Sequence, residues 1–458
     1  MLTQQNSVHF VGIGGAGMSA IAKVLLEMGY KVSGSDLKPS STTQKLADMG
    51  ATTYIGHRRE NLHAPDLLIV STAIPDTNVE VVAARDAGIP ILQRGEMLAH
   101  LMEMKRGIAV AGSHGKTTTT SMIALLLERT GMEPTVLIGG ELNDIGGNAK
   151  LGNGEYLVAE ADESDGSFLK LKPEIAIVTN IEDDHLDYYG AVEKIVASFR
   201  NFLTNVQSGG VSIVCIDSNN VKEIINNYTG NVLTYSVKGT ADLMAKDIKL
   251  SGLGSESRIV YHNQELGVLP LNVPGVHNIA NALAAVAVGL HCGLSFHAIA
   301  QALVAFRGVH RRFELVGEVA GVKVFDDYGH HPTEIKATLK AARQGGFKRI
   351  IAIFQPHRYT RTKFLFNEFA QAFEDADEVI ITDIYPAGEQ PIPGVNAALI
   401  INQMQQVKQN VHYVPELRSI PSYLTPRLKE GDLVLTIGAG DVWQAGVGLI
   451  DMLQQQAG

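Results

Sequence analysis

The stretch IAVAGSHGKTTTT, residues 108–120, indicates the fold of the central part of the chain. An apolar run typical of a β-strand leads into a short loop at residues 112–115, and a segment of helical character follows. Such a junction binds anions, because backbone N–H groups and the helix dipole point at the same place. Lys116 adds a positive charge for the β- and γ-phosphates of a nucleotide, and Thr117 supplies a hydroxyl for Mg²⁺. The stretch therefore predicts a phosphate loop.

The match to the known phosphate-loop pattern is partial. The strict form G-x-x-x-x-G-K-[ST] is not met, since its first glycine would fall on Val110. The shorter core G-x-x-G-K-T is met from Gly112 to Thr117, between an expected strand at 108–111 and an expected helix at 121–129. The alternative is an ordinary strand-to-helix turn that contains a lysine, and this setting favours the phosphate loop.

A second glycine-rich turn lies near the N-terminus. GIGGAG at 12–17 follows an expected strand at 8–11 and precedes an expected helix at 18–28. A second strand at 31–35 ends at Asp36. This order is the dinucleotide-binding fingerprint, in which an acidic residue follows the glycines by about 20 positions. By itself the fingerprint is a weak signal.

Length and composition describe a multidomain globular protein. The chain has 458 residues, a length that is enough for about three domains of ~150 residues. Of these residues 45% are hydrophobic and 19% are charged, as in packed globular domains. A net charge of −10 argues against broad binding to nucleic acid or to an anionic membrane. The chain has two cysteines, and its N-terminus resembles no signal peptide. We expect a cytoplasmic protein that is a monomer or a weak homodimer.

The alternation of expected strands and helices predicts an α/β fold with three domains. The first, residues 1–105, is Rossmann-like; the second, 106–310, has a mainly parallel sheet of the phosphate-loop ATPase type; the third, 311–458, is again Rossmann-like. Further strands are expected at 67–71, 89–92, 156–159, 175–179, 211–215, 323–325, 349–354, 378–381 and 433–437. Further helices are expected at 278–290, 333–343 and 363–373. Residues 233–271 alternate polar and apolar positions, as antiparallel strands do.

Acidic residues follow two of the expected central strands. AEADESD at 159–165 and NIEDDHLD at 180–187 both lie where a parallel sheet presents its carboxyl edge. Mg²⁺ binds one or two protein carboxylates together with phosphate oxygens, so one glutamate of the first loop would suffice. His185 is a candidate for a second metal or for orienting the acceptor. Either loop alone would suit a solvated surface, but two of them near a phosphate loop favour a metal site.

Arginine, histidine and aspartate concentrate in three stretches of the third segment: FRGVHRRF at 306–313, FDDYGHHPTE at 325–334 and FQPHRYTRTK at 354–363. Arginine binds carboxylates and phosphates through its forked donors, so these stretches favour a binding role over surface ion pairs. His330 and His331 would point to opposite faces of an extended segment, which argues against a shared metal. The remaining histidines without such context are expected to be structural: His57, His63, His100, His291, His297 and His412.

Together these motifs resemble the Mur ligases, ATP-dependent enzymes that form amide bonds in peptidoglycan synthesis. The similarity spans the chain and rests on GIGGAGMSAIA at 12–22, GSHGKTTTT at 112–120, AEADESD at 159–165, TNIEDDHLD at 179–187, PGVHNIANALAA at 274–285, HRRFE at 310–314, DDYGHHPTEI at 326–335 and FQPHRYTR at 354–361. The last two resemble the branch of the family that joins L-alanine to UDP-N-acetylmuramate. The branch most easily confused with it recycles murein peptides.

The resemblance implies a role for each domain. The first would bind UDP-N-acetylmuramate, so that its glycines hold a UDP pyrophosphate and not NAD. The second would bind ATP with Mg²⁺, and the third would bind L-alanine and close over the site. An acyl phosphate would form first and then react with the alanine amine. Several relatives carry a carbamylated lysine after the DHxD loop, but residues 198–200 read SFR, so we expect none here.

The resemblance also implies site residues. Lys116, His185, Arg312 and Asp327 would be catalytic. ATP would contact Gly112, Ser113, His114, Gly115, Lys116, Thr117, Thr118, His277, Asn278, Asn281, Arg312 and Asp327. The UDP-sugar would contact Gly14, Gly15, Ala16, Gly17, Met18, Asp36 and Ser71. The amino acid would contact Tyr328, His357, Arg358 and Arg361. The metal ligands would be Thr117, Glu160 and His185.

Two other functions compete with this one. The glycines of the first turn and Asp36 would also suit an NAD-dependent dehydrogenase, but that function leaves the phosphate loop unexplained. A nucleotide-dependent switch or binding module would use the phosphate loop, hydrolyse ATP slowly and form no amide.

Overall fold

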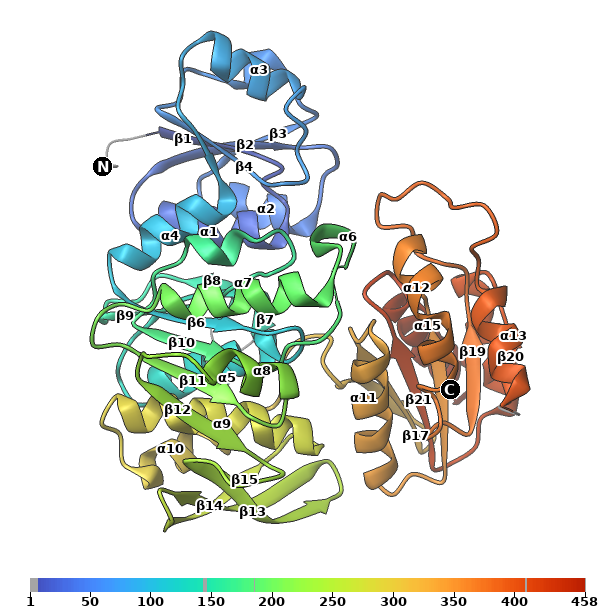
Figure 1. Cartoon of the computed structure of the whole chain (residues 1–458). Coiled ribbons are helices and arrows are strands. Elements are labelled where there is room, and N and C mark those ends of the chain that lie inside the picture. The colour runs from blue at the N-terminus through green and yellow to red at the C-terminus, as the bar shows by residue number, and fades with distance from the viewer. Residues whose placement is uncertain (1–6, 143–145, 185, 408–409, 458) are drawn as a thin grey trace. The chain divides into compact units, whose positions relative to one another are not determined.

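The structure is a computed structural model that describes residues 7–142, 146–184, 186–407 and 410–457. Within these residues the chain forms three β-sheets with helices packed on them (Figure 1). The α/β class predicted from the sequence is confirmed. Among the described residues, none of the helices has the length and apolar character needed to cross a membrane.

The N-terminal sheet has the strand order β3-β2-β1-β4-β5. All of its pairings are parallel, and this is the order of the first five strands of a Rossmann sheet. The central strands are buried apolar runs, as expected when helices cover both faces. The strands are β1 (Ser7–Val11), β2 (Lys31–Asp36), β3 (Thr52–Ile55), β4 (Leu67–Val70) and β5 (Ile91–Gln93).

The second sheet has the order β15-β14-β13-β12-β11-β10-β6-β9-β7-β8. Strand β6 lies between β10 and β9 and pairs in parallel with both, whereas β8 is antiparallel to β7. The strands are β6 (Arg106–Ala111), β7 (Thr135–Leu142), β8 (Gly147–Lys150), β9 (Tyr156–Glu160), β10 (Ile175–Val178), β11 (Val211–Cys215), β12 (Val232–Ser236), β13 (Leu243–Ser251), β14 (Gly254–Tyr261) and β15 (Gln264–Leu271).

The third sheet has the order β16-β17-β21-β18-β19-β20. Only β16 among these described strands runs antiparallel to its neighbour. The strands are β16 (Glu314–Val319), β17 (Val322–Asp327), β18 (Arg349–Phe354), β19 (Glu378–Ile381), β20 (Val411–Tyr413) and β21 (Asp432–Ile437).

Helices connect most of the parallel strands. They are α1 (Ala16–Glu27), α2 (Ser41–Asp48), α3 (Val79–Asp86), α4 (Arg94–Glu103), α5 (Lys116–Arg129), α6 (Leu186–Tyr189), α7 (Val192–Thr204), α8 (Asn219–Ile225), α9 (Val276–His291), α10 (Phe296–Leu303), α11 (Pro332–Gln344), α12 (Tyr359–Ala370), α13 (Ala398–Gln406), α14 (Ile420–Leu424) and α15 (Trp443–Ala457). Short 3₁₀ turns are η1 (Arg59–Asn61), η3 (Ser167–Lys170), η4 (Leu417–Ser419) and η5 (Thr425–Arg427).

The described residues divide into two compact units. The first contains the described residues of 7–246, 259–267 and 280–303, and the second contains those of 247–258, 268–279 and 304–457. Within the first unit, helix α1 contacts β7 and β8, so that the N-terminal and second sheets share one hydrophobic core. The second unit has its own apolar clusters on the two faces of the third sheet.

Two predicted helix starts are wrong. Helix α5 begins at Lys116 and not at residue 121, so the four threonines at 117–120, which have low intrinsic helix propensity, lie at its start. Helix α12 begins at Tyr359 and not at residue 363. Its first turn is held by Glu389, whose carboxylate accepts hydrogen bonds from the Thr360 backbone N–H and hydroxyl at 3.0 and 2.6 Å. Such a cap comes from a distant loop, so local sequence gives no sign of it.

Candidate functional site

The phosphate loop connects β6 to α5 at the carboxyl edge of the second sheet. Gly112 has φ +138°, and a Cβ there would lie 2.0 Å from the Thr179 hydroxyl oxygen. Gly115 has φ +80°, and a Cβ there would lie 2.6 Å from Asn281 Oδ1. Both glycines are therefore required by backbone conformation and by close neighbours. Helix α5 begins directly after Gly115, so its first N–H groups face the loop.

The segment after β10 holds the loop in place. The Thr179 hydroxyl and the Asn180 amide donate hydrogen bonds to the His114 carbonyl at 2.6 and 2.9 Å. In return, the His114 backbone N–H donates to Asn180 Oδ1 at 2.9 Å. The Glu182 backbone N–H donates to the Ser113 hydroxyl oxygen at 2.9 Å. The two loops that the sequence singled out separately therefore form one hydrogen-bonded structure.

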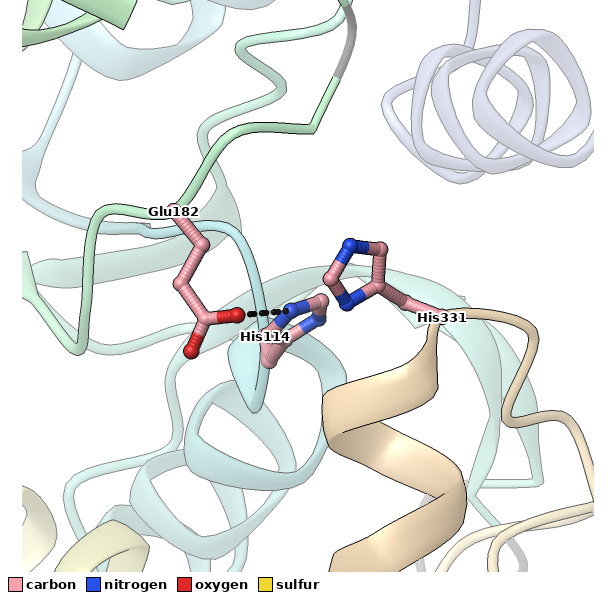
Figure 2. Close-up of side chains that lie close together, drawn as sticks. All are labelled: His114, Glu182 and His331. Atoms are coloured by element: carbon pink, nitrogen blue, oxygen red, sulfur yellow. Dashed lines mark ion pairs between the residues drawn. The ribbon is translucent and has the colours of Figure 1, made fainter. Parts of the chain in front are cut away.

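His114 also forms an ion pair with Glu182. Its Nε2 lies 3.3 Å from a carboxylate oxygen of Glu182, as the dashed line in Figure 2 marks. Figure 2 also labels His331, which comes directly before helix α11. The Thr333 backbone N–H donates a hydrogen bond to the His331 ring, so this histidine is the N-cap of that helix.

Lys116 contacts the loop itself. Its ammonium donates hydrogen bonds to the Gly112 carbonyl at 2.7 Å, to the Ser113 carbonyl at 3.3 Å and to Glu163 Oε1 at 2.6 Å. Burial lowers the pKa of Lys116, but the carboxylates of Glu163, Asp162 and Glu160 outweigh burial and raise this pKa above its ordinary value. Lys116 is therefore protonated at neutral pH.

Glu163 is a site residue that the sequence reasoning did not single out. Its side chain is only 2% exposed, and burial raises the pKa of its carboxyl although Lys116 opposes that shift. The sequence signal was available, because Glu163 lies in the AEADESD stretch. What the stretch did not reveal is which of its acids turns toward the lysine.

The carboxyl edge of the sheet offers oxygen ligands for Mg²⁺. Glu160 ends strand β9, in register with Val110 of β6, and its Oε1 accepts a hydrogen bond from the Gly139 backbone N–H at 2.8 Å. Thr117 follows Lys116 in the first turn of α5. A carboxylate and a hydroxyl are ligands that Mg²⁺ prefers, so these residues fit that ion. The predicted third ligand, His185, lies outside the described residues.

The N-terminal glycine turn connects β1 to α1. The N–H groups of Gly12 and Ile13 donate to the Ser35 carbonyl at 2.8 and 3.0 Å, and the Gly14 N–H donates to the Asp36 carboxylate at 2.9 Å. A Cβ at Gly14 would lie 2.8 Å from that carboxylate. Asp36 therefore fixes the turn, a role that the fingerprint alone does not reveal.

The other residues predicted for the UDP-sugar lie around this turn. Gly15 is the N-cap of α1, whose first turn contains Ala16 and Gly17 and no acidic side chain, so the positive end of the helix dipole suits an anion. Met18 is 2% exposed and packs in the core, which leaves its backbone as the part able to contact a ligand. Ser71 comes directly after β4.

Arg94 connects the glycine turn with the acidic loop after β9. A Cβ on Gly17 would lie 3.0 Å from the Arg94 guanidinium. The same guanidinium lies 3.1 Å from Asp162 and 3.6 Å from Asp165. Thr72, in the loop after β4, donates a hydrogen bond to Asp165 at 3.2 Å. Arg94 thus lies beside the glycine turn and pairs with the acidic loop whose Glu163 contacts Lys116.

The predicted contacts to the nucleotide base lie on helix α9. Asn281 accepts a hydrogen bond from the Thr119 hydroxyl at 3.2 Å, on the helix that follows the phosphate loop. The Asn278 amide donates to the Pro274 carbonyl at 2.7 Å. His277 lies near the start of the helix.

In the second unit, Arg312 and Asp327 lie close together. The Asp327 carboxylate accepts hydrogen bonds from the backbone N–H groups of Phe313 at 2.9 Å and Gly329 at 2.8 Å. Burial raises the pKa of Asp327 to about 6, and the positive charge of Arg312 partly offsets that shift. Arg312 forms its ion pair with Glu334, at 3.3 Å. Glu334 was not predicted as a partner.

The residues predicted for the amino acid also form a connected group. Arg361 lies in the first turn of α12, with its guanidinium 3.2 Å from His357 Nδ1. The His357 ring stacks on Tyr385 with centroids 5.7 Å apart, and the Arg358 backbone N–H donates to the Tyr385 carbonyl at 2.8 Å. Tyr328 is connected to His357 through His330, whose ring lies 5.7 Å from each of theirs. The guanidinium groups of Arg311 and Arg312 lie over the Tyr328 ring.

These features define an α/β protein that binds nucleotides, because a phosphate loop and a dinucleotide-type turn both open at carboxyl edges of parallel sheets. Three family descriptions match the chain: "Mur ligase family, catalytic domain" at residues 7–106, "Mur ligase middle domain" at 110–289 and "Mur ligase, glutamate ligase domain" at 311–440. The chain belongs to the Mur ligase family.

The similar proteins include UDP-N-acetylmuramate–L-alanine ligases and a murein peptide ligase. A UDP-N-acetylmuramate–L-alanine ligase of Pelotomaculum thermopropionicum is 54% identical over 456 residues, 99% of each chain, and one of Desulforamulus reducens is 52% identical over 457 residues, 99% of each chain. The solved UDP-N-acetylmuramate–alanine ligase of Thermotoga maritima has a TM-score of 0.85 at 30% identity, covering 99% of this chain and 100% of its own. A murein peptide ligase of Psychrobacter arcticus has a TM-score of 0.71 at 26% identity, covering 98% of each.

Proposed function

We propose that this protein is an ATP-dependent ligase that joins L-alanine to UDP-N-acetylmuramate in peptidoglycan synthesis. The observation that carries the proposal is the arrangement of the first unit, in which Arg94 lies beside the glycine turn and pairs with the loop whose Glu163 contacts Lys116. Such an arrangement suits a reaction between a UDP-linked substrate and ATP. The names of the full-length relatives support the choice of sugar and amino acid.

Lys116 and the start of α5 would carry the first step. In that step the muramyl carboxylate attacks the γ-phosphate, forming an acyl phosphate and releasing ADP. Both reactants are anions, so positive charge has to be concentrated between them. The Lys116 ammonium and the free N–H groups of the helix supply this charge. Mg²⁺, held by Thr117, Glu160 and His185, would neutralise further charge on the phosphates.

The second unit would supply the amino acid. The alanine carboxylate would pair with Arg361, in a small pocket shaped by Tyr328, His357 and Arg358. The alanine amine then attacks the acyl carbonyl, the bond to the phosphate oxygen breaks, and inorganic phosphate leaves. Arg312 and Asp327 would act on the nucleotide, whose base would contact His277, Asn278 and Asn281. The UDP pyrophosphate would bind Gly14, Gly15, Ala16 and Gly17, with Met18, Asp36 and Ser71 around it.

We further propose domain boundaries near residues 105 and 310, which separate the UDP-sugar, ATP and amino-acid domains. For the assembly, we propose a cytoplasmic monomer or weak homodimer. Analytical ultracentrifugation across a concentration series tests the assembly, and a stable higher oligomer would contradict it.

The decisive experiment measures phosphate release together with amide formation. Purified protein with Mg²⁺ and ATP should turn over only when UDP-N-acetylmuramate and L-alanine are both present, and phosphate and amide should form in equal amounts. Slow ATP hydrolysis without amide would instead indicate a nucleotide-dependent switch. A change in nicotinamide absorbance with substrate and NAD, and no ATP turnover, would indicate a dehydrogenase.

A further inference from the structure

The partner of Lys116 is a buried carboxylate that the two reaction steps above do not use. The Lys116 ammonium is 2.6 Å from Glu163 Oε1, and the Glu163 side chain is 2% exposed. The same ammonium donates to the Gly112 and Ser113 carbonyls, so it lies against the phosphate loop. The phosphate oxygens of a nucleotide would have to bind the Lys116 ammonium at this place. The Glu163 carboxylate therefore occupies the position that those oxygens would take.

The position of Glu163 is fixed by its backbone. Its carbonyl accepts hydrogen bonds from the Tyr189 hydroxyl at 2.6 Å and from the Gly166 N–H at 3.1 Å. The preceding residue, Asp162, is directed elsewhere, because it pairs with Arg94 at 3.1 Å and accepts from the Ser164 N–H at 3.0 Å. Glu163 is thus the acid of this loop that is placed to contact the lysine.

We propose that Glu163 is a positioning residue that holds Lys116 in the nucleotide-free loop and is exchanged for phosphate oxygens when a nucleotide binds. The exchange has a physical basis: an unpaired buried charge is costly, so the ammonium keeps a carboxylate until another anion replaces it. This inference rests on the proposed function, since it takes the loop as the site of ATP phosphates.

Two consequences follow from the exchange. Part of the free energy of nucleotide binding is spent on breaking the pair, so the loop binds more weakly than it would with an unpaired lysine. The pair also keeps the lysine ordered before ATP arrives, so the free protein is more stable with Glu163 than without it.

The test uses Glu163→Gln in the full-length chain, with MgADP and the non-hydrolysable analogue MgAMP-PNP as probes in isothermal titration calorimetry. Glutamine keeps the size of the side chain and removes its charge. We expect both probes to bind about tenfold tighter, equivalent to about 1.4 kcal/mol. Thermal unfolding without nucleotide should start at a lower temperature than in the wild type, and saturating MgADP should largely restore it.

A double-mutant cycle with Lys116→Met separates exchange from simple repulsion between Glu163 and the phosphates. If Glu163 acts through Lys116, Glu163→Gln should no longer tighten binding when Lys116 is already methionine. In that background Glu163→Gln should also raise the thermal midpoint, because it removes a buried carboxylate that has lost its lysine. The control is Glu174→Gln, which breaks the ion pair with Arg106 at 2.6 Å and should leave nucleotide affinity unchanged.

The outcomes distinguish the inference from the function on which it rests. If the wild type binds neither probe, the phosphate-loop function itself is wrong. If the wild type binds and Glu163→Gln changes affinity less than twofold, or tightens binding equally in the methionine background, only the exchange is wrong. Should Glu163→Gln fail to fold, Glu163→Asp withdraws the carboxylate by one methylene, and unchanged affinity in that variant would overturn the inference.

Discussion

At the scale of single residues, the site depends on charged groups held away from solvent by specific partners. The Lys116 ammonium donates hydrogen bonds to two carbonyls and one buried carboxylate. The Asp327 carboxylate accepts hydrogen bonds from two backbone N–H groups. Groups fixed in this way hold a defined position before a ligand arrives, which is how preorganised charge contributes to catalysis. Substitutions at these residues should therefore change function and pH dependence more than they change the fold.

Replacing Lys116 tests the phosphate loop directly. Lys116→Ala removes the charge that would neutralise the transferring phosphoryl group, so we expect turnover to fall by orders of magnitude. Circular dichroism should show a wild-type fold. The matched control is Lys150→Ala, which removes a lysine paired with Glu128 away from the loop and should leave turnover near the wild-type value. Near-normal ligation by a folded Lys116→Ala would exclude the phosphate-loop assignment.

Arg361 is expected to bind the carboxylate of alanine. Arg361→Ala removes a charge-assisted pair worth about 1.5–3 kcal/mol, so the KM for alanine should rise by about 10- to 150-fold. The apparent affinities for ATP and the UDP-sugar should change little. Arg343→Ala, at the surface pair with Asp377, is the control and should leave all three constants unchanged. If Arg361→Ala lost nucleotide binding and kept its KM for alanine, the alanine pocket would have to lie elsewhere in the protein.

The buried carboxyl of Asp327 should make stability depend on pH. Its pKa in the folded protein is about 6, whereas an unfolded chain titrates near about 3.9. The folded state therefore holds the proton more tightly, and the resulting stabilisation is complete below pH of about 4 and lost as pH rises through about 6. As pH rises across that window, the free energy of unfolding of the wild type should fall by up to about 3 kcal/mol relative to that of Asp327→Asn.

Urea unfolding of wild type and Asp327→Asn at several pH values measures this difference. Comparing the two proteins at each pH cancels the titration of all other groups. A difference in unfolding free energy that stays constant between pH 4 and 6.5 would show that Asp327 titrates normally in the folded protein.

At the scale of elements, the site is built from strand–turn–helix units that end at carboxyl edges of parallel sheets. The same device appears twice in the first unit, as β1–turn–α1 and as β6–loop–α5. In each, glycines let the backbone approach its neighbour, and a helix N-terminus faces the turn. A different side chain completes each unit: Asp36 holds Gly14 in the first, and Lys116 lies in the second.

Ligand protection of the first turn distinguishes the two dinucleotide-type functions. We expect UDP-N-acetylmuramate to slow hydrogen exchange of the backbone amides around residues 14–17, because the pyrophosphate would accept hydrogen bonds from them. NAD at the same concentration should leave exchange unchanged. The loop around Gly346, in the second unit, serves as an internal reference. Protection by NAD and none by the UDP-sugar would favour a dehydrogenase.

At the scale of the whole molecule, the described residues form two compact units, and the N-terminal sheet belongs to the same unit as the phosphate loop. Helix α1 packs on β7 and β8, Asn148 donates a hydrogen bond to the Ala16 carbonyl at 3.0 Å, and Arg94 pairs with Asp162. A domain boundary near residue 105 would therefore separate two sequence segments that share one core.

This shared core predicts that binding at one turn stabilises the other. UDP-N-acetylmuramate at about 100 times its Kd should add about 2.7 kcal/mol to the stability of the unit to which it binds. We expect the slowly exchanging amides of α5 to gain this protection together with those of α1, because both exchange through opening of the same unit. Amides of α11 provide the comparison. Protection confined to residues 7–105 would show that the N-terminal sheet opens independently.

The α/β class, the strands that carry the site and the phosphate loop were predictable from sequence because they depend on local patterns. Buried parallel strands are continuous apolar runs, and glycines at strand ends mark turns that other residues cannot form. These signals located β6, β9, β10, β18 and β19 within a few residues. The resemblance of FQPHRYTR to the alanine-adding branch likewise needed only the order of residues, and the similar proteins bear that name.

Other properties were decided only by the tertiary structure. The pairing of Lys116 with Glu163, the pairing of Arg94 with Asp162 and the cap that Glu389 places on α12 all join residues distant in sequence. Sequence shows which charges are present. Which of them meet, and which lose contact with water, depends on how strands from separate segments order themselves in a sheet. Burial then sets the energy of each charge, and burial is a property of the folded chain alone.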